Sequence, residues 1–154
     1  MRERLTRGKR TDNDEGEFVY GIPVEGEVVD GVGKETYIIT NPGLQWVDGV
    51  YMTYDECIEV DPETVGDYTG LTDKNGRKIF EGDILQCENE YGSYTTSIYC
   101  EENTLCVDVS WLDNFDYTSI GFAGSIWKKQ NYEVEIIGNI YDNPELLEVK
   151  QNEV

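Results

Sequence analysis

The sequence predicts a mostly β protein, made of an N-terminal and a C-terminal β unit with only short helical turns. Apolar and polar residues alternate with period two over much of the chain, and the alternating segments are rich in β-branched and aromatic residues. Clusters of Gly, Asn, Asp and Pro separate these segments at short intervals. A chain of 154 residues can bury a hydrophobic core without disulfides.

The expected strands follow the alternating segments in chain order. They lie within residues 17–24, 35–40, 49–54, 56–60, 96–102, 104–111 and 132–141. Turn clusters lie between them, at residues 12–16, 25–33, 41–43, 73–76, 88–93 and 142–144.

Two places favour a single helical turn. Asp61 precedes Pro62, and Asn143 precedes Pro144, so each pair offers an N-cap side chain followed by a proline at the first helical position. The first of these marks a break between the two units. We therefore expect an N-terminal β unit at 1–60, a connecting segment at 61–76, a second β unit at 77–147 and a polar tail at 148–154.

The charge of the chain is strongly acidic, with 32 acidic residues, 12 basic residues, no histidine and a formal net charge of −20. This balance disfavours direct binding of nucleic acids or anionic membranes, because both need clustered cations. It favours basic partners, or a surface that imitates a polyanion. No apolar run resembles a signal peptide or a membrane helix, so we expect a cytoplasmic protein.

The basic residues are concentrated near the N-terminus. Five of the twelve are Arg2, Arg4, Arg7, Lys9 and Arg10, directly before the turn at 12–16 and the next strand. A hairpin across that turn would let these cations neutralise their own sheet, and we prefer this interpretation to a nucleic-acid-binding arm.

The four cysteines form no C-x-x-C pair, which a zinc knuckle or ribbon would normally contain. In a reducing compartment they are best interpreted as small apolar strand residues, and a four-thiolate metal site is the alternative. They are Cys57, Cys87, Cys100 and Cys106. We expect no metal and no cofactor.

The absence of histidine excludes the Ser-His-Asp triad, the Cys-His dyad and the HExxH zinc helix. A calcium loop centred on Gly76 fails because its first and last ligand positions would be Leu71 and Gly82. A carboxylate-metal nuclease could use Glu148 and Lys150, and a glycosidase could use paired acids. We expect a protein that is not an enzyme.

The stretch DYTGLTDKNGRKIFEGDILQ, residues 67–86, is predicted to join and register strands. Asn75 and Gly76 form a favoured pair for a tight turn with positive φ, and Gly82 with Asp83 forms a second bend. In such turns Asp73 and Asp83 can accept hydrogen bonds from nearby backbone amides.

The aromatic residues between positions 109 and 127 are the other candidates for contact with a partner. Core packing accounts for most of them, and an exposed remainder would suit a protein, a small molecule or another subunit. The candidate binding residues over the whole chain are Tyr68, Asp73, Asp83, Trp111, Phe115 and Trp127.

Several segments, taken together, resemble one known family. They are Arg7-Gly8-Lys9, Phe18-Val19-Tyr20-Gly21, VDPETVG at 60–66, YTGLTDKNG at 68–76, IFEGDI at 79–84, IGNIY at 137–141 and NPEL at 143–146. In order and spacing the chain resembles the YopX family of phage and prophage proteins. The resemblance implies a phage-encoded protein whose C-terminal half is an SH3-like barrel, and a homo-oligomer. It supplies no catalytic residues, and its motifs thin out between 91 and 129.

From these observations we expect a non-enzymatic accessory protein in the host cytoplasm. It would bind a host protein or a small ligand, and counter-defence is one form that such a role could take. The alternatives are an acidic mimic of DNA that targets a nucleic-acid-binding protein, and a carboxylate-metal phosphodiesterase.

Overall fold

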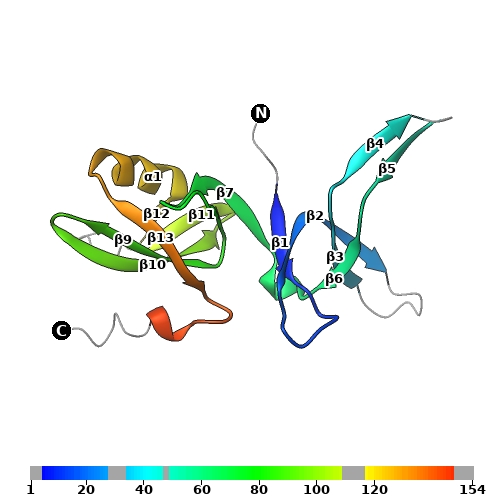
Figure 1. Cartoon of the computed structure of the whole chain (residues 1–154), viewed down its shortest axis with the longest axis horizontal. Helices are drawn as coiled ribbons and strands as arrows, with labels where there is room; N and C mark the ends of the chain where they lie inside the picture. Colours follow the sequence, from blue (N-terminus) through cyan, green and yellow to red (C-terminus); the bar gives the residue numbers. More distant parts are fainter. Residues whose placement is uncertain (1–4, 28–33, 47–48, 109–116, 148–154) are drawn as a thin grey trace. The chain divides into compact units, whose positions relative to one another are not determined.

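The computed structural model describes residues 5–27, 34–46, 49–108 and 117–147. The chain divides into two compact units, Met1–Asp67 and Tyr68–Val154. Each unit is dominated by antiparallel strands (Figure 1). No helix in the described ranges is long and apolar enough to span a membrane.

The first unit contains four strands in the order β6-β3-β2-β1 and a separate two-stranded hairpin, β4–β5. An isolated antiparallel bridge between Arg10 and Val60 joins the two ends of the four-stranded set. The strands are β1 (Thr6–Lys9), β2 (Phe18–Glu27), β3 (Lys34–Ile39), β4 (Gly43–Trp46), β5 (Val50–Thr53) and β6 (Cys57–Val60). The short 3₁₀ helix η1 (Pro62–Thr64) follows β6.

The predicted N-terminal hairpin is confirmed, since β1 pairs antiparallel with residues 18–21 of β2. Its cations contact an aromatic ring and the intervening loop. The guanidinium of Arg7 lies 3.9 Å from the ring centroid of Phe18, and Lys9 Nζ donates a 3.1 Å hydrogen bond to the carbonyl of Gly16. Arg10 forms an ion pair with Asp12 in the same loop.

The core of the first unit consists of Val19, Ile38, Ile58 and Val60, with Val65 packed against it. The strands approach very closely at one point. A Cβ atom on Gly21 would lie 1.9 Å from the carbonyl oxygen of Ile39, so only glycine fits there.

The second unit is built around a five-stranded antiparallel sheet with the order β12-β11-β10-β9-β13. Its strands are β9 (Asp83–Asn89), β10 (Gly92–Glu101), β11 (Thr104–Asp108), β12 (Tyr117–Ser119) and β13 (Glu133–Asn139). Two further strands precede this sheet, β7 (Gly66–Thr72) and β8 (Lys78–Phe80), and they pair with each other.

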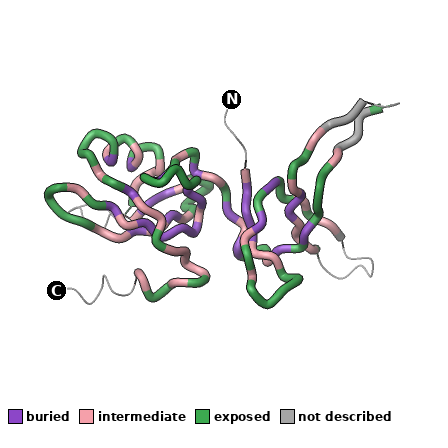
Figure 2. The backbone as a smooth tube through the Cα atoms, in the orientation of Figure 1, coloured by how far each residue is buried: buried purple, intermediate pink, exposed green. Residues whose placement is uncertain are grey.

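Helix α1 (Ile120–Lys129) contributes Ala123 and Trp127 to the core of the second unit, among strand side chains. The buried members are Ile79, Leu85, Cys87, Ile98, Val107, Ala123, Trp127 and Val134. Figure 2 shows buried residues along the strands and on one side of the helix. Because Trp127 and Val134 share this core, the helix and β13 are held in a fixed relation.

The mostly β prediction is confirmed, and so is the turn at Asp61, whose side chain accepts a 3.0 Å hydrogen bond from the N–H of Glu63. Near the C-terminus, Leu146 N donates to Asn143 O, as in a helical turn. The helices are few and short, but α1, with ten residues, is longer than the single turns that the sequence predicted. The SH3-like barrel is not confirmed, since β12 and β13 form the two ends of an open sheet among the described residues.

Candidate functional site

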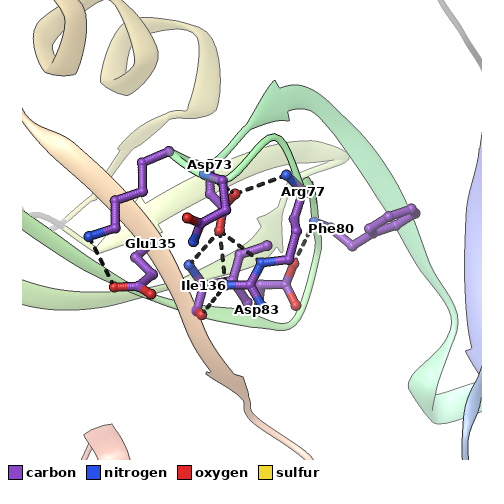
Figure 3. A network of polar contacts seen from close by, with 8 residues as sticks. Asp73, Arg77, Phe80, Asp83, Glu135 and Ile136 are labelled. Atoms are coloured by element: carbon purple, nitrogen blue, oxygen red, sulfur yellow. Dashed lines mark hydrogen bonds and ion pairs between the residues drawn. The ribbon is translucent and has the colours of Figure 1, made fainter.

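The side chain of Asp73 lies at the centre of a network that joins a turn to a distant strand (Figure 3). Its Oδ1 accepts hydrogen bonds from the N–H groups of Asn75 and Arg77, both at 2.9 Å. Its Oδ2 accepts from the N–H of Ile136 at 3.1 Å and pairs with the guanidinium of Arg77 at 3.0 Å. We call this set of contacts the Asp73 clamp.

The turn that carries the clamp is a three-residue hairpin loop. Gly76 N donates to Asp73 O at 3.0 Å, and Asp73 N donates to Arg77 O at 2.8 Å. Gly76 has a φ of +79°, whereas Asn75 is not among the residues with positive φ. This is the pattern of a type I turn followed by a glycine in the left-handed region. The predicted tight turn is therefore confirmed, with its positive φ at Gly76.

The same turn forms hydrogen bonds with backbone groups of β13 that do not pair with β9. Lys74 N donates to Val134 O at 2.8 Å, and an Arg77 guanidinium nitrogen donates to Ile136 O at 2.7 Å. With the bond from Ile136 N to Asp73, three polar groups on one side of β13 are satisfied. In an antiparallel ladder such groups point away from the paired strand, so the turn takes the place of a neighbouring strand.

Two opposing effects act on the pKa of Asp73. Burial raises it, but hydrogen bonds from the N–H groups of Arg77, Ile136 and Asn75 lower it, and so does the positive charge of Arg77. The bonds outweigh burial, and the pKa lies below its ordinary 3.8. A carboxylate that is ionised and fully engaged in this way is a structural group.

Asp83 and Tyr68 have structural contacts of a similar kind. Asp83 is buried, and its Oδ2 accepts a 2.8 Å hydrogen bond from Phe80 N, which closes the bend between β8 and β9. The ring of Tyr68 packs on the ring of Phe80 at a centroid distance of 5.6 Å. Lys78 Nζ lies 5.7 Å from the centroid of the Tyr68 ring.

A cleft of about 290 Å³ lies beside the clamp, and this volume is just below the usual range for small-ligand sites, which begins at about 300 Å³. It is formed by the end of β7, the clamp turn, α1 and the start of β13. The lining residues are Leu71, Thr72, Asp73, Lys74, Gly124, Trp127, Tyr132, Glu133 and Val134. Lys74 Nζ at this cleft lies 3.4 Å from Glu135 and 3.9 Å from Glu133.

The aromatic side of the cleft is fixed from behind. Trp127 is almost fully buried, and its indole N–H donates a hydrogen bond to the hydroxyl of Tyr94. Burial is the main cause that raises the pKa of the Tyr94 phenol. Tyr94 and Tyr132 meet edge to face with ring centroids 5.5 Å apart. These contacts hold the aromatic wall in place, and the flexible charged side chains at the cleft are Lys74 and Glu133.

The structure places the candidate residues in two groups. Asp73 and Trp127 both line the cleft, whereas Tyr68 and Asp83 meet through Phe80 away from it. Trp111 and Phe115 lie outside the described residues. Sequence reasoning missed Lys74, Tyr132 and Glu133. The alternation of apolar and polar residues at 132–135 predicted a strand, but nothing in it indicated that α1 would lie across the cleft from that strand.

In the described part of the chain, no group of three or more Cys, Asp or Glu side chains is placed to hold a metal ion. The four cysteines, all within the described ranges, form no disulfide, and Cys87 and Cys106 are buried whereas Cys57 and Cys100 are exposed. Glu148 and Lys150, the candidate nuclease residues, lie outside the described residues.

The family model described as YopX protein matches residues 12–148. The chain belongs to the YopX family. One similar solved structure is protein EF1440 from Enterococcus faecalis, with a TM-score of 0.58 and 23% identity, covering 96% of this chain and 99% of the other. Another is protein yopX from Bacillus subtilis, with a TM-score of 0.48 and 16% identity, covering 95% and 98%. No curated protein matches the chain.

The similarity to EF1440 extends over nearly the whole of both chains, so the two share a fold. Within this YopX-family chain, the segments quoted above for the resemblance include the clamp turn and the bend at Asp83. Both positions are engaged in backbone hydrogen bonds. In this chain the motif residues at these positions hold the backbone turns, and the cleft beside the clamp is the candidate contact site.

Proposed function

We propose that this YopX-family protein is a non-enzymatic accessory protein of a phage or prophage, which acts by binding. Its target is a bacterial host protein or a small ligand, and counter-defence is one such role. The proposal includes a homo-oligomer, in which exposed aromatic residues contact either another subunit or the ligand. Phage origin and counter-defence rest on the association of the YopX family with phages.

The cleft beside the Asp73 clamp is the observation that supports binding most directly. It combines an aromatic wall at Trp127 and Tyr132 with one adjustable cation, Lys74. Pockets that bind small molecules typically pair an apolar wall with a few polar groups. Two of the candidate binding residues, Asp73 and Asp83, are buried carboxylates that accept hydrogen bonds from backbone amides.

A comparison of native and denatured masses tests the proposal. The protein is expressed in bacteria, purified gently, and weighed by native mass spectrometry and again after denaturation, and the lysate proteins retained on it are recorded. The variant Lys74→Gln changes the cleft, and Lys128→Gln, an exposed lysine of α1 that does not line it, is the matched control.

We expect the wild type and Lys128→Gln to carry a bound molecule or a partner that Lys74→Gln loses. A loss of about tenfold in affinity, about 1.4 kcal/mol, is the expected size of the effect. A wild-type protein that is a bare monomer and retains no specific partner contradicts the proposal. If Lys74→Gln and the wild type retain the bound molecule or partner equally, the contact does not lie at the cleft.

The second candidate is polyanion mimicry, and the internal use of the few cations favours it. Arg77 is held in the clamp, Arg10 pairs with Asp12, and Lys9 bonds to the Gly16 carbonyl. These three cations are therefore engaged locally and do not offset the negative charge elsewhere on the chain. Binding by mimicry weakens steeply as salt rises, so a partner whose affinity is the same at low and high ionic strength contradicts this candidate.

A further inference from the structure

The sequence contains a single Asn-Gly pair, and it lies inside the Asp73 clamp turn. We propose that Asn75 is a deamidation site controlled by the Asp73 clamp: the closed turn slows the reaction, and the isoaspartate product opens the clamp. The side chain of Asn75 is exposed, and, apart from the adjacent residues of the chain, no heavy atom lies within 4 Å of where a Cβ on Gly76 would be. Neither neighbouring side chains nor burial therefore protect the Asn75-Gly76 pair from the reaction.

The reaction needs only base and water. The backbone nitrogen of Gly76 gives its proton to the base and attacks Cγ of Asn75, which forms the new N–Cγ bond. The leaving nitrogen Nδ2 takes up a proton, and the Cγ–Nδ2 bond breaks as ammonia leaves. One water then opens the resulting succinimide at either carbonyl. Opening at one gives aspartate, and opening at the other gives isoaspartate, whose main chain runs through the former side chain.

The closed turn opposes the first step. The proton that Gly76 must lose is donated to Asp73 O in a 3.0 Å hydrogen bond. The peptide groups on either side are also held, because the N–H groups of Asn75 and Arg77 both bond to Asp73 Oδ1 at 2.9 Å. The Gly76 nitrogen can turn toward Cγ only when the loop opens, so the rate follows the population of locally open protein.

The isoaspartate product does not fit the closed turn. It adds one methylene to the main chain between positions 75 and 76. The two N–H groups that flank this point can then no longer both reach Asp73 Oδ1. Arg77 is displaced with its own N–H, and its bonds to Asp73 and to Ile136 O are lost. The aspartate product keeps the original main chain and therefore keeps the clamp.

The test compares deamidation of the wild-type protein when folded and when unfolded in urea, in the same mildly alkaline buffer. Peptide mapping by mass spectrometry, with separation of the isoaspartyl peptide, gives the rate at Asn75. We expect the folded rate to be slower by about tenfold or more, corresponding to an opening free energy of about 1.4 kcal/mol. Equal rates in the two states overturn the protective role of the clamp, and this comparison needs no variant.

Two variants sharpen the comparison. Arg77→Gln removes the guanidinium contacts and leaves the backbone turn, and we expect a folded rate between those of folded and unfolded wild type. Asn75→Gln lacks the five-membered ring closure and gives the background. The isoaspartyl protein should unfold at lower urea than the wild type, while Asn75→Asp should match the wild type. An isoaspartyl protein with the wild-type midpoint overturns the second half of the proposal.

Discussion

Asp73 Oδ2 accepts a 3.1 Å hydrogen bond from the backbone N–H of Ile136, which lies 63 residues further along the chain. This contact joins the turn after β7 to the outer strand β13, at the place where the register with β9 shifts between Ile136 and Gly138. Because β13 is the last strand of its sheet, the backbone groups that point away from β9 face no further strand of that sheet. The carboxylate supplies an acceptor where the sheet has no strand to do so.

The variant Asp73→Ala should destabilise the second unit by about 3 kcal/mol, because it leaves three partly buried N–H groups without their acceptor. Urea unfolding followed by circular dichroism measures this change. Glu133→Ala is the matched control, since Glu133 is mostly exposed and its nearest cation is 3.9 Å away, and it should change stability by less than about 0.5 kcal/mol. Equal effects of the two substitutions would contradict the structural role of Asp73.

The contribution of Asp73 should also depend on pH. Its pKa in the folded protein lies below 3.8, so the stabilisation is fully present above the unfolded value and is lost as pH falls through the lower folded value. The difference in stability between wild type and Asp73→Asn should therefore be constant from about pH 7 to about pH 5 and should shrink below about pH 4. Urea midpoints at several pH values test this, and a difference that grows in acid would show the opposite sign.

The variant Gly82→Ala should be destabilising by about 1–2 kcal/mol, because Gly82 has a φ of +93° and L-residues resist this region. A Cβ there would also lie 2.9 Å from Cε2 of Tyr141. Gly121→Ala is the control, since nothing lies within 4 Å of the place in α1 that its Cβ would take. It should be neutral or stabilising by up to about 1 kcal/mol. Thermal unfolding distinguishes the two.

The N-cap of α1 gives a fourth prediction. Ser119 Oγ accepts a 3.3 Å hydrogen bond from Phe122 N, so Ser119→Ala should cost about 1 kcal/mol while Ser119→Asp should not. Helix content and the urea midpoint measure the effect. Ser125→Ala, within the same helix, is the control, and a loss of stability there equal to that of Ser119→Ala would argue against capping.

The period-two pattern predicted the strands well because most of them bury one face only, as the alternating exposure of β6 illustrates. The helix α1 was missed for a physical reason. Two glycines and neighbouring aromatics lower its helix propensity, whereas burial of Ala123 and Trp127 in the core stabilises it. The spacing of Ile120, Ala123 and Trp127, together with Ser119 as N-cap, was a signal that could have identified it.

The candidate site was predictable only in part. The turn chemistry of Asp73 and Asp83 follows from short-range sequence, so their backbone bonds were foreseen. The partners of Asp73 on β13 were not, because a contact over 63 residues depends on how the sheet and helix pack. For the same reason the cleft, which needs α1 and β13 together, could not be located from the pattern.

The turn that lies along β13 has one more consequence, for the behaviour of the protein at high concentration. An outer strand whose amides and carbonyls are unoccupied can add a strand from a second molecule, and this is a common route to fibrils. Lys74, Asp73 and Arg77 occupy those groups from within the chain. A chain that has lost this cover is thus expected to self-associate through β13, even where most of its fold survives.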